Sequence, residues 1–79
     1  MKKRDARGAL EHLRAAVRLK PGFAPARNNL AWVLESTGDF QGAEAECRQA
    51  MALAQGDPII DGSCKRLNDE IGASGKLVR

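Results

Sequence analysis

The sequence predicts an all-α fold of about four antiparallel helices, arranged as helix–turn–helix repeats in a short α-solenoid fragment. Apolar residues recur every three or four positions in four segments, which is the period of an amphipathic helix. Glycine and proline separate these segments, and none alternates apolar and polar residues as a strand would. Residues 5–22 and 39–56 also resemble each other at an offset of 34 positions. Together these observations favour a short helical repeat array.

Length and composition are those of one small domain. The 79 residues are 43% hydrophobic and 29% charged, with one Trp and two Phe as the aromatic residues. This balance argues against disorder, while at this length core burial only just offsets the loss of chain entropy. We therefore interpret residues 1–79 as a single domain.

The first two helices are predicted over residues 5–20 and 25–37. The apolar stripe of the first is formed by Ala6, Ala9, Leu10, Leu13, Ala16 and Val17. Pro21 and Gly22 end that helix. The second begins near Pro25, which a first helical turn tolerates, and it is apolar on nearly all sides. Such a helix is typically sandwiched between neighbours.

The third and fourth helices are predicted over residues 40–54 and 58–72. Gly38 ends the preceding helix in a left-handed conformation, and Asp39 is a good N-cap for the third. The fourth helix carries a narrower apolar stripe, formed by Ile60, Cys64, Leu67 and Ile71. Residues 73–79 are predicted to be a flexible tail.

Identical residues recur at the offset of 34 positions. The matched pairs are Asp5/Asp39, Gly8/Gly42, Ala9/Ala43, Arg14/Arg48, Ala16/Ala50, Leu19/Leu53 and Gly22/Gly56. The second unit also contains an Asn-Leu-Ala sequence at 29–31 and a Gly-Asp-Phe turn at 38–40. In this period and these motifs the chain resembles the tetratricopeptide repeat family.

The resemblance implies about one and a half repeats and a cap. Residues 5–21 would be helix B of a partial repeat, residues 24–55 a full repeat, and residues 58–72 a capping helix. Five positions depart from the family pattern, and two of them are glycines. Arg27 replaces its Trp, Ala31 its Gly, and Gln55 its second closing Pro.

Two glycines stand where the family usually has a capping-box glutamate. They are Gly8 and Gly42, one in each helix B. Each is expected to weaken its helix by about 0.5–1 kcal/mol relative to alanine, because glycine loses more backbone entropy on folding.

The resemblance also implies a binding face. In this family helix A lines a concave groove that holds extended peptides or partner helices. The corresponding positions here are Asn28, Asn29, Trp32, Glu35 and Ser36. Helical spacing places them on one side of the second helix. The cations of the family's carboxylate clamp are absent from these positions, so we do not expect recognition of an acidic chaperone tail.

The individual side chains have more than one interpretation. Trp32 is either an aromatic anchor for a ligand or a packing residue against a neighbouring helix. Asn28 and Asn29 are expected at the surface, where an amide can both donate to and accept from a ligand backbone.

No catalytic, metal or cofactor site is predicted. His12 is expected at the surface. Cys47 and Cys64 lie on apolar stripes, where buried thiols pack and are inert. A disulfide between them requires that the last helix fold onto residues 40–54. We therefore predict a non-catalytic protein that uses no cofactor.

Protein partners are predicted, including a second copy of the chain. About three repeats are needed for independent stability, and the first helix lacks the helix A that should cover it. Either the chain belongs to a longer array or another chain supplies the cover. We predict self-association as a homodimer through the first two helices.

The charge distribution supplies an alternative function. The formal net charge is +3, but residues 1–20 carry seven Lys/Arg against two acids, whereas residues 21–58 carry two against five. A basic first helix could bind nucleic acid or an acidic partner through Lys2, Lys3, Arg4, Arg7, Arg14 and Arg18. No stacking aromatic accompanies these charges, so nucleic acid is the weaker hypothesis.

Membrane association and secretion are not predicted. No segment reaches the roughly 20 apolar residues of a membrane span. The basic start is not followed by the apolar segment of a signal peptide. We therefore predict a cytoplasmic protein.

Overall fold

The computed structural model describes residues 3–73, which form four α-helices and no strand. The helices are α1 (Lys3–Leu19), α2 (Ala24–Thr37), α3 (Phe40–Leu53) and α4 (Pro58–Ala73). The predicted all-α class is confirmed, and each helix begins and ends within two residues of its predicted bounds. The flexible tail predicted for residues 73–79 lies outside the described residues from position 74 onward.

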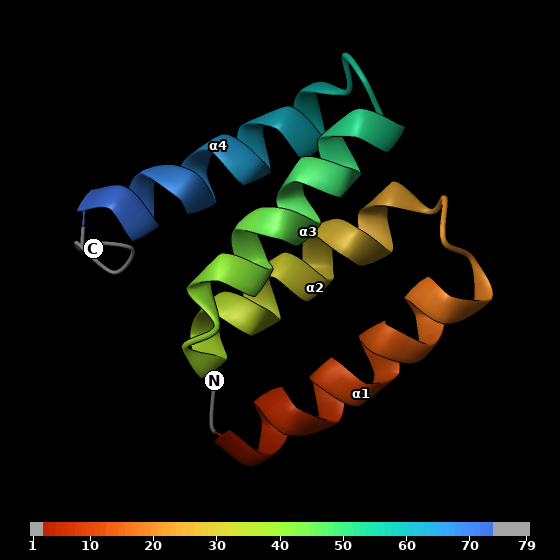
Figure 1. Ribbon diagram of the computed structural model, residues 1–79, viewed down its shortest axis with the longest axis vertical. Coiled ribbons are helices and arrows are strands. Elements are labelled where there is room, and N and C mark those ends of the chain that lie inside the picture. Colours follow the sequence, from red (N-terminus) through yellow and green to blue (C-terminus); the bar gives the residue numbers. More distant parts are fainter. Residues whose placement is uncertain (1–2, 74–79) are drawn as a thin grey trace.

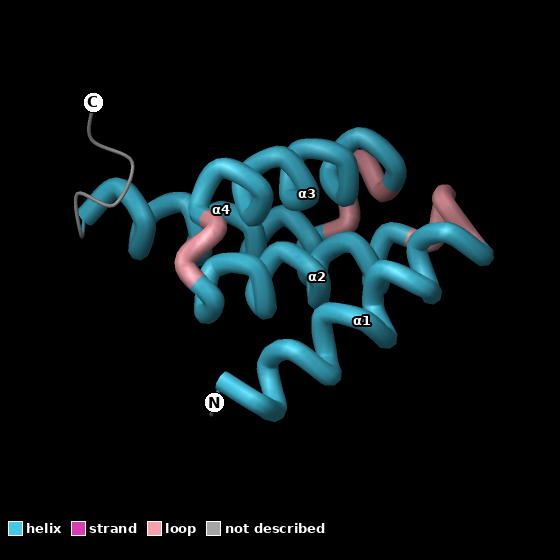
Figure 2. Tube along the Cα trace, turned by 60° about the horizontal axis from the view of Figure 1, so that its bottom comes forward, coloured by secondary structure: helices cyan, strands magenta, loops and turns pink. Residues whose placement is uncertain are grey.

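The helices alternate in direction, and α2 and α3 form the central pair (Figure 1). α1 packs against α2 on one side of this pair, and α4 packs against both α2 and α3 on the other. Figure 2 shows the same order from a second direction. α2 therefore contacts all three other helices, which explains why apolar residues surround it.

The turn between α2 and α3 follows from two adjacent residues. Gly38 adopts a φ of 96°, and its N–H donates to the Glu35 carbonyl oxygen at 3.1 Å. Asp39 then caps α3, because its carboxylate accepts a hydrogen bond from the Gly42 N–H at 2.9 Å. These are the stop and the N-cap that the sequence predicts.

Gly42 has a steric role that its position in the sequence does not reveal. A Cβ atom at this position would lie 2.5 Å from the Asp39 Oδ2 atom, so a side chain must displace the capping carboxylate. At the equivalent Gly8, no described atom beyond the adjacent residues and the backbone of α1 lies within 4 Å of such a Cβ atom. The expected entropic cost of glycine is therefore accompanied by a steric benefit at Gly42 alone.

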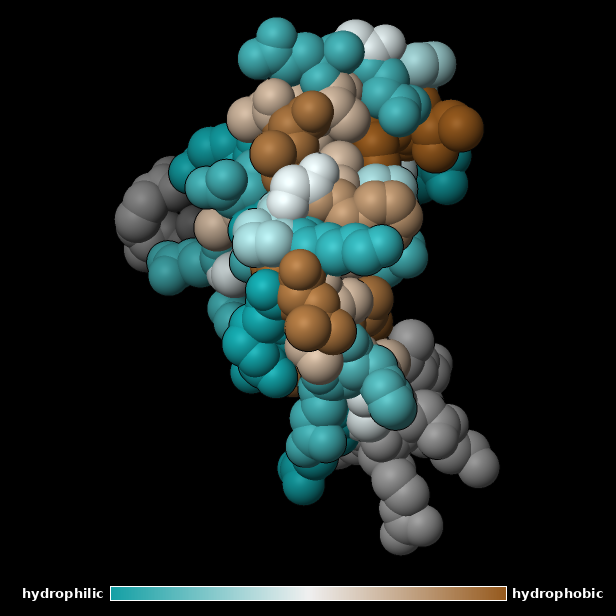
Figure 3. Space-filling view, turned by 90° about the vertical axis from the view of Figure 1, so that its right-hand side faces the viewer, coloured by the Kyte–Doolittle hydropathy of each residue, from teal (hydrophilic) through white to brown (hydrophobic). Residues whose placement is uncertain are grey.

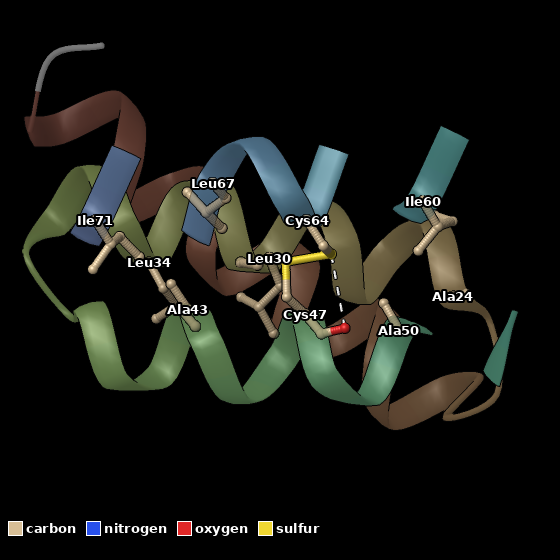
Figure 4. Packing of buried hydrophobic residues seen from close by; sticks show 11 residues of the cluster. Ala24, Leu30, Leu34, Ala43, Cys47, Ala50, Ile60, Cys64, Leu67 and Ile71 are labelled. Carbon is tan, nitrogen blue, oxygen red and sulfur yellow. Dashed lines mark hydrogen bonds between the residues drawn. A yellow bond between two sulfur atoms is a disulfide. The ribbon is translucent and has the colours of Figure 1, made fainter. Parts of the chain in front are cut away.

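The core lies where α4 crosses the α2–α3 pair (Figure 4). Leu67 and Ile71 of α4 are almost completely buried against this pair, and the small side chains of Ala43 and Ala50 line α3. Alanine at these two positions leaves room for α4 to approach closely. The apolar stripe predicted for α4 is thus its buried face.

Cys47 and Cys64 form a disulfide that joins α3 to α4 (Figure 4). Their Cα atoms are 5.5 Å apart, within the usual range for a disulfide, and neither residue is exposed to solvent. The expected burial of both cysteines is confirmed, whereas the expectation that they are free thiols is wrong. The stated requirement for a disulfide, that α4 fold onto α3, is met.

Among the described residues, α1 is covered on one side only, by α2. Its stripe residues Leu10, Leu13 and Val17 are partly buried against the core, and Leu19 is 82% exposed. Large apolar side chains are also exposed in or next to the α1–α2 and α3–α4 connections. They are Phe23, Leu53 and Ile59. Figure 3 shows this side of the molecule, where apolar areas are separated by hydrophilic ones.

Candidate interaction face

Trp32 lies at the junction of α2 and α4. Its indole Nε1–H donates to the Ser63 Oγ atom at 2.6 Å, which satisfies the indole donor and fixes the orientation of the ring. The ring packs against the core cluster but remains only partly buried. The packing interpretation thus describes one part of this side chain, and the other part stays accessible to a ligand.

Asn28 lies beneath α4 instead of at the surface. It is only 8% exposed, and its Oδ1 atom is 3.5 Å from the Cys64 Sγ atom. The same sulfur is 3.7 Å from the Cys47 carbonyl oxygen. A disulfide sulfur has no hydrogen, so these are packing contacts in the oxidised protein, whereas a Cys64 thiol could donate to either oxygen. The expected surface position of Asn28 is therefore corrected, because α4 covers it.

The other predicted residues lie on the same side of α2 and are more accessible. Asn29 and Ser36 are exposed, and Glu35 is partly buried. The Ser36 hydroxyl donates to the Val33 carbonyl oxygen at 2.8 Å, within its own helix. Glu35 already takes part in an interaction within the protein. Asn29 offers an exposed donor and acceptor on one side chain.

Sequence reasoning missed Ser63, which orients the Trp32 ring. The spacing between these residues carries no signal, because their contact depends on how α4 crosses α2. Ser63 is partly buried at that crossing, so α4 contributes one edge of the accessible surface around Trp32.

Sequence reasoning also missed the role of Arg27, although its departure from the repeat pattern was visible. Its Nε–H donates to the Pro21 carbonyl oxygen at 2.9 Å, and its Nη1 lies 3.0 Å from the Glu46 Oε1 atom. The two charged side chains are only 17% and 23% exposed. Arg27 therefore joins α2 to α3 and to the loop after α1, at the position where the repeat pattern has an aromatic residue.

The side chains on this side of α2 carry groups suited to non-covalent contacts. An aromatic ring, an exposed amide and hydroxyl groups can contact a ligand by stacking and hydrogen bonding. Within residues 3–73, no group of three or more His, Cys, Asp or Glu residues is placed to hold a metal ion. No described helix is long and apolar enough to cross a membrane.

Comparison with known proteins gives a family match. A family model described as tetratricopeptide repeat matches residues 1–67, which include α1, α2, α3 and the first part of α4. No match was found among curated proteins or among solved structures.

Proposed function

The chain belongs to the tetratricopeptide repeat family, and from this premise we propose that it binds a peptide or a partner helix through the exposed side of α2. The family match indicates a protein–protein interaction module in general, and such repeats typically act as non-catalytic scaffolds. Helical repeats present extended concave surfaces for binding. The proposal assigns this task to one surface of the chain.

We define the interaction face as Asn29, Trp32, Glu35 and Ser36, with Ser63 at its edge. The observation that carries the proposal is the position of Trp32, whose ring is fixed by Ser63 yet remains partly accessible. Orienting an aromatic side chain before binding reduces the entropy lost on association, and aromatic anchors are frequent hot spots. Asn28 belongs to the same side of α2 and supports α4 from below.

The test is affinity capture from the native cell with the wild-type chain and with Trp32→Ala. The amount of partner captured by the variant is expected to be lower than that of the wild type by a factor of at least about ten, because an aromatic anchor typically contributes much of the binding energy. Gln49→Ala, at an exposed position of α3, serves as the control and should capture the wild-type amount. Equal capture by all three proteins contradicts the proposal.

Circular dichroism separates lost binding from lost folding. Trp32→Ala should retain most of its helicity, because the ring is only partly buried. A collapse of helicity would assign Trp32 to the core and remove it from the interaction face. Trp32→Phe keeps a smaller aromatic ring and loses the donor to Ser63, so it should bind better than Trp32→Ala.

We also propose that the chain self-associates as a homodimer through α1 and α2. The support is the incomplete cover of α1, whose stripe residues Leu10 and Leu13 are only partly buried. A second chain could supply the missing cover. Analytical ultracentrifugation should show a mass that increases with concentration towards that of a dimer. A constant monomer mass together with a sharp thermal transition would contradict this proposal.

Nucleic acid is not the partner that we propose. Arg14 and Arg18 share a cleft with Asp39 and Glu46, which would repel a run of phosphates. A salt titration with short DNA and RNA tests this expectation. Binding of either nucleic acid at low salt would contradict it.

The cytoplasmic localisation stays a prediction. Disulfides are uncommon in the reducing cytosol, so the localisation requires its own measurement in the native cell.

A further inference from the structure

A cleft lies between α1 and α3, with α2 as its floor. Both helices pack against α2, but within the described residues no Cα atom of α1 lies within 8 Å of a Cα atom of α3. The resulting cleft has a volume of about 360 Å³, within the range of ligand-binding pockets. Val17, Leu30 and Leu34 give it an apolar base. An aliphatic side chain could therefore be buried there.

The cleft is separate from the interaction face. Leu30 and Leu34 line the cleft, whereas Trp32 and Ser36 belong to the interaction face. Each residue of a helix is rotated by about 100° about the helix axis relative to the one before it, so side chains two positions apart point in nearly opposite directions. The two surfaces therefore lie on opposite sides of α2, and binding at one leaves the other free.

The charges around the cleft are not equally available. Asp39 accepts the hydrogen bond from the Gly42 N–H, and Glu46 is paired with Arg27. Arg14 and Arg18 are exposed, and neither forms an ion pair with a residue of the described part of the chain. The cleft thus combines two acids that already have partners with two arginines that pair with no acid among the described residues.

The two arginines are one helical turn apart, so their guanidinium groups can point to the same side of α1. Arginine binds carboxylates through pairs of parallel hydrogen bonds, which suits an acidic ligand. A run of phosphates would place further negative charge against Asp39 and Glu46 on the opposite wall, whereas a protein segment can present uncharged polar side chains there. The charge pattern therefore favours an acidic protein segment.

We propose that this cleft is a second binding site, and that its ligand is an acidic, apolar segment of a partner protein. A leucine-sized side chain of the segment occupies the base formed by Val17, Leu30 and Leu34. Carboxylates one helical turn apart on the same segment pair with Arg14 and Arg18. This site goes beyond the proposed function, because it lies on the other side of α2 and selects for acidic sequences.

The probe is an acetylated, amidated twelve-residue peptide that carries two leucines and two glutamates at helical spacing. Its binding to the full ¹⁵N-labelled chain is followed by NMR. The amide signals of Val17, Leu30 and Leu34 are expected to shift. Replacing the glutamates by glutamine, or the leucines by serine, should weaken binding at least about tenfold, which corresponds to the loss of about 1.4 kcal/mol.

The protein variants assign the effect to the cleft. Arg14→Gln/Arg18→Gln should weaken binding of the acidic peptide at least about tenfold. The control Lys65→Gln/Arg66→Gln removes the same charge from exposed positions of α4 and should bind as the wild type does. All four positions are exposed, so helicity should be retained in both variants. Trp32→Ala should leave this binding unchanged, which separates the cleft from the interaction face.

Four results would overturn the proposal. The first is the absence of amide signal shifts at millimolar peptide concentration. The second is an equal loss of peptide affinity in both double variants, which would indicate attraction by net charge alone. Displacement of the peptide by a short DNA or RNA at moderate salt would assign the cleft to nucleic acid. Loss of a dimer in Arg14→Gln/Arg18→Gln, without loss of peptide binding, would assign the two arginines to contact with a second copy.

Discussion

Reduction of the Cys47–Cys64 disulfide is expected to lower the free energy of unfolding by about 3 kcal/mol. The two residues are separated by 17 positions in the chain. In the chain-entropy model, closing a loop of this length removes about 3 kcal/mol of conformational free energy from the unfolded state at 25 °C. The folded state should change little, because the reduced Cys64 thiol finds acceptors in the Asn28 side chain and the Cys47 carbonyl. The difference therefore arises mainly in the unfolded state.

The assay is thermal unfolding followed by circular dichroism, with and without dithiothreitol. A domain of this size changes its Tm by about 4–8 °C per kcal/mol, so reduction should lower the Tm by about 12–24 °C. Alkylation and mass spectrometry of the unfolded chain count the thiols, with none expected before reduction and two after. The control is Cys47→Ala/Cys64→Ala, whose Tm should not respond to dithiothreitol.

Two results would refute this reasoning. Equal Tm values for the oxidised chain, which has no thiols, and the reduced chain, which has two, would show that the cross-link does not lower the conformational entropy of the unfolded state. Two alkylated cysteines in the unreduced chain would show that the disulfide does not form. In the second case the sulfurs would be buried thiols, and Asn28 would serve as a hydrogen-bond acceptor for Cys64.

Two further comparisons test the local structure by urea unfolding. Gly8→Ala should raise the free energy of unfolding by about 0.5–1 kcal/mol. Gly42→Ala should be at least about 1 kcal/mol less stabilising than Gly8→Ala, because it displaces the capping carboxylate of α3. Equal effects of the two substitutions would contradict this steric argument. Arg27→Met should destabilise by about 1–2 kcal/mol, since it leaves the largely buried Glu46 without its partner. The control Arg48→Met breaks an exposed ion pair and should change stability by less than about 0.5 kcal/mol, so a similar loss in both variants would argue against a special role for Arg27.

The helices and their turns could be predicted because the signals for them are local. Gly38 and Asp39 end one helix and begin the next through contacts within five residues along the chain. The apolar stripe of α4 likewise became its buried face, since a spacing of three and four residues places side chains on one side of any helix. These features do not depend on which neighbour is packed against the helix.

The candidate site could be predicted only in part. Helical spacing placed Asn29, Trp32 and Ser36 on one side of α2, but it placed Asn28 there as well. Asn28 is covered because α4 crosses that part of the helix, bringing Cys64 within 3.5 Å of its side chain. The partner of Trp32 depends on the same crossing, because Ser63 reaches the indole from 31 positions away in the chain.

The sequence alone determined four helices, their bounds to within two residues, their apolar faces and the repeat to which they belong, because periodicity and capping act between residues close in the chain. Only the tertiary structure decided that Cys47 and Cys64 are joined, that Asn28 is covered, and that Arg27 pairs with Glu46. Each of these depends on the angle and depth at which two helices pack. That geometry is set by the combined shape of all the facing side chains, which no single segment of the sequence contains.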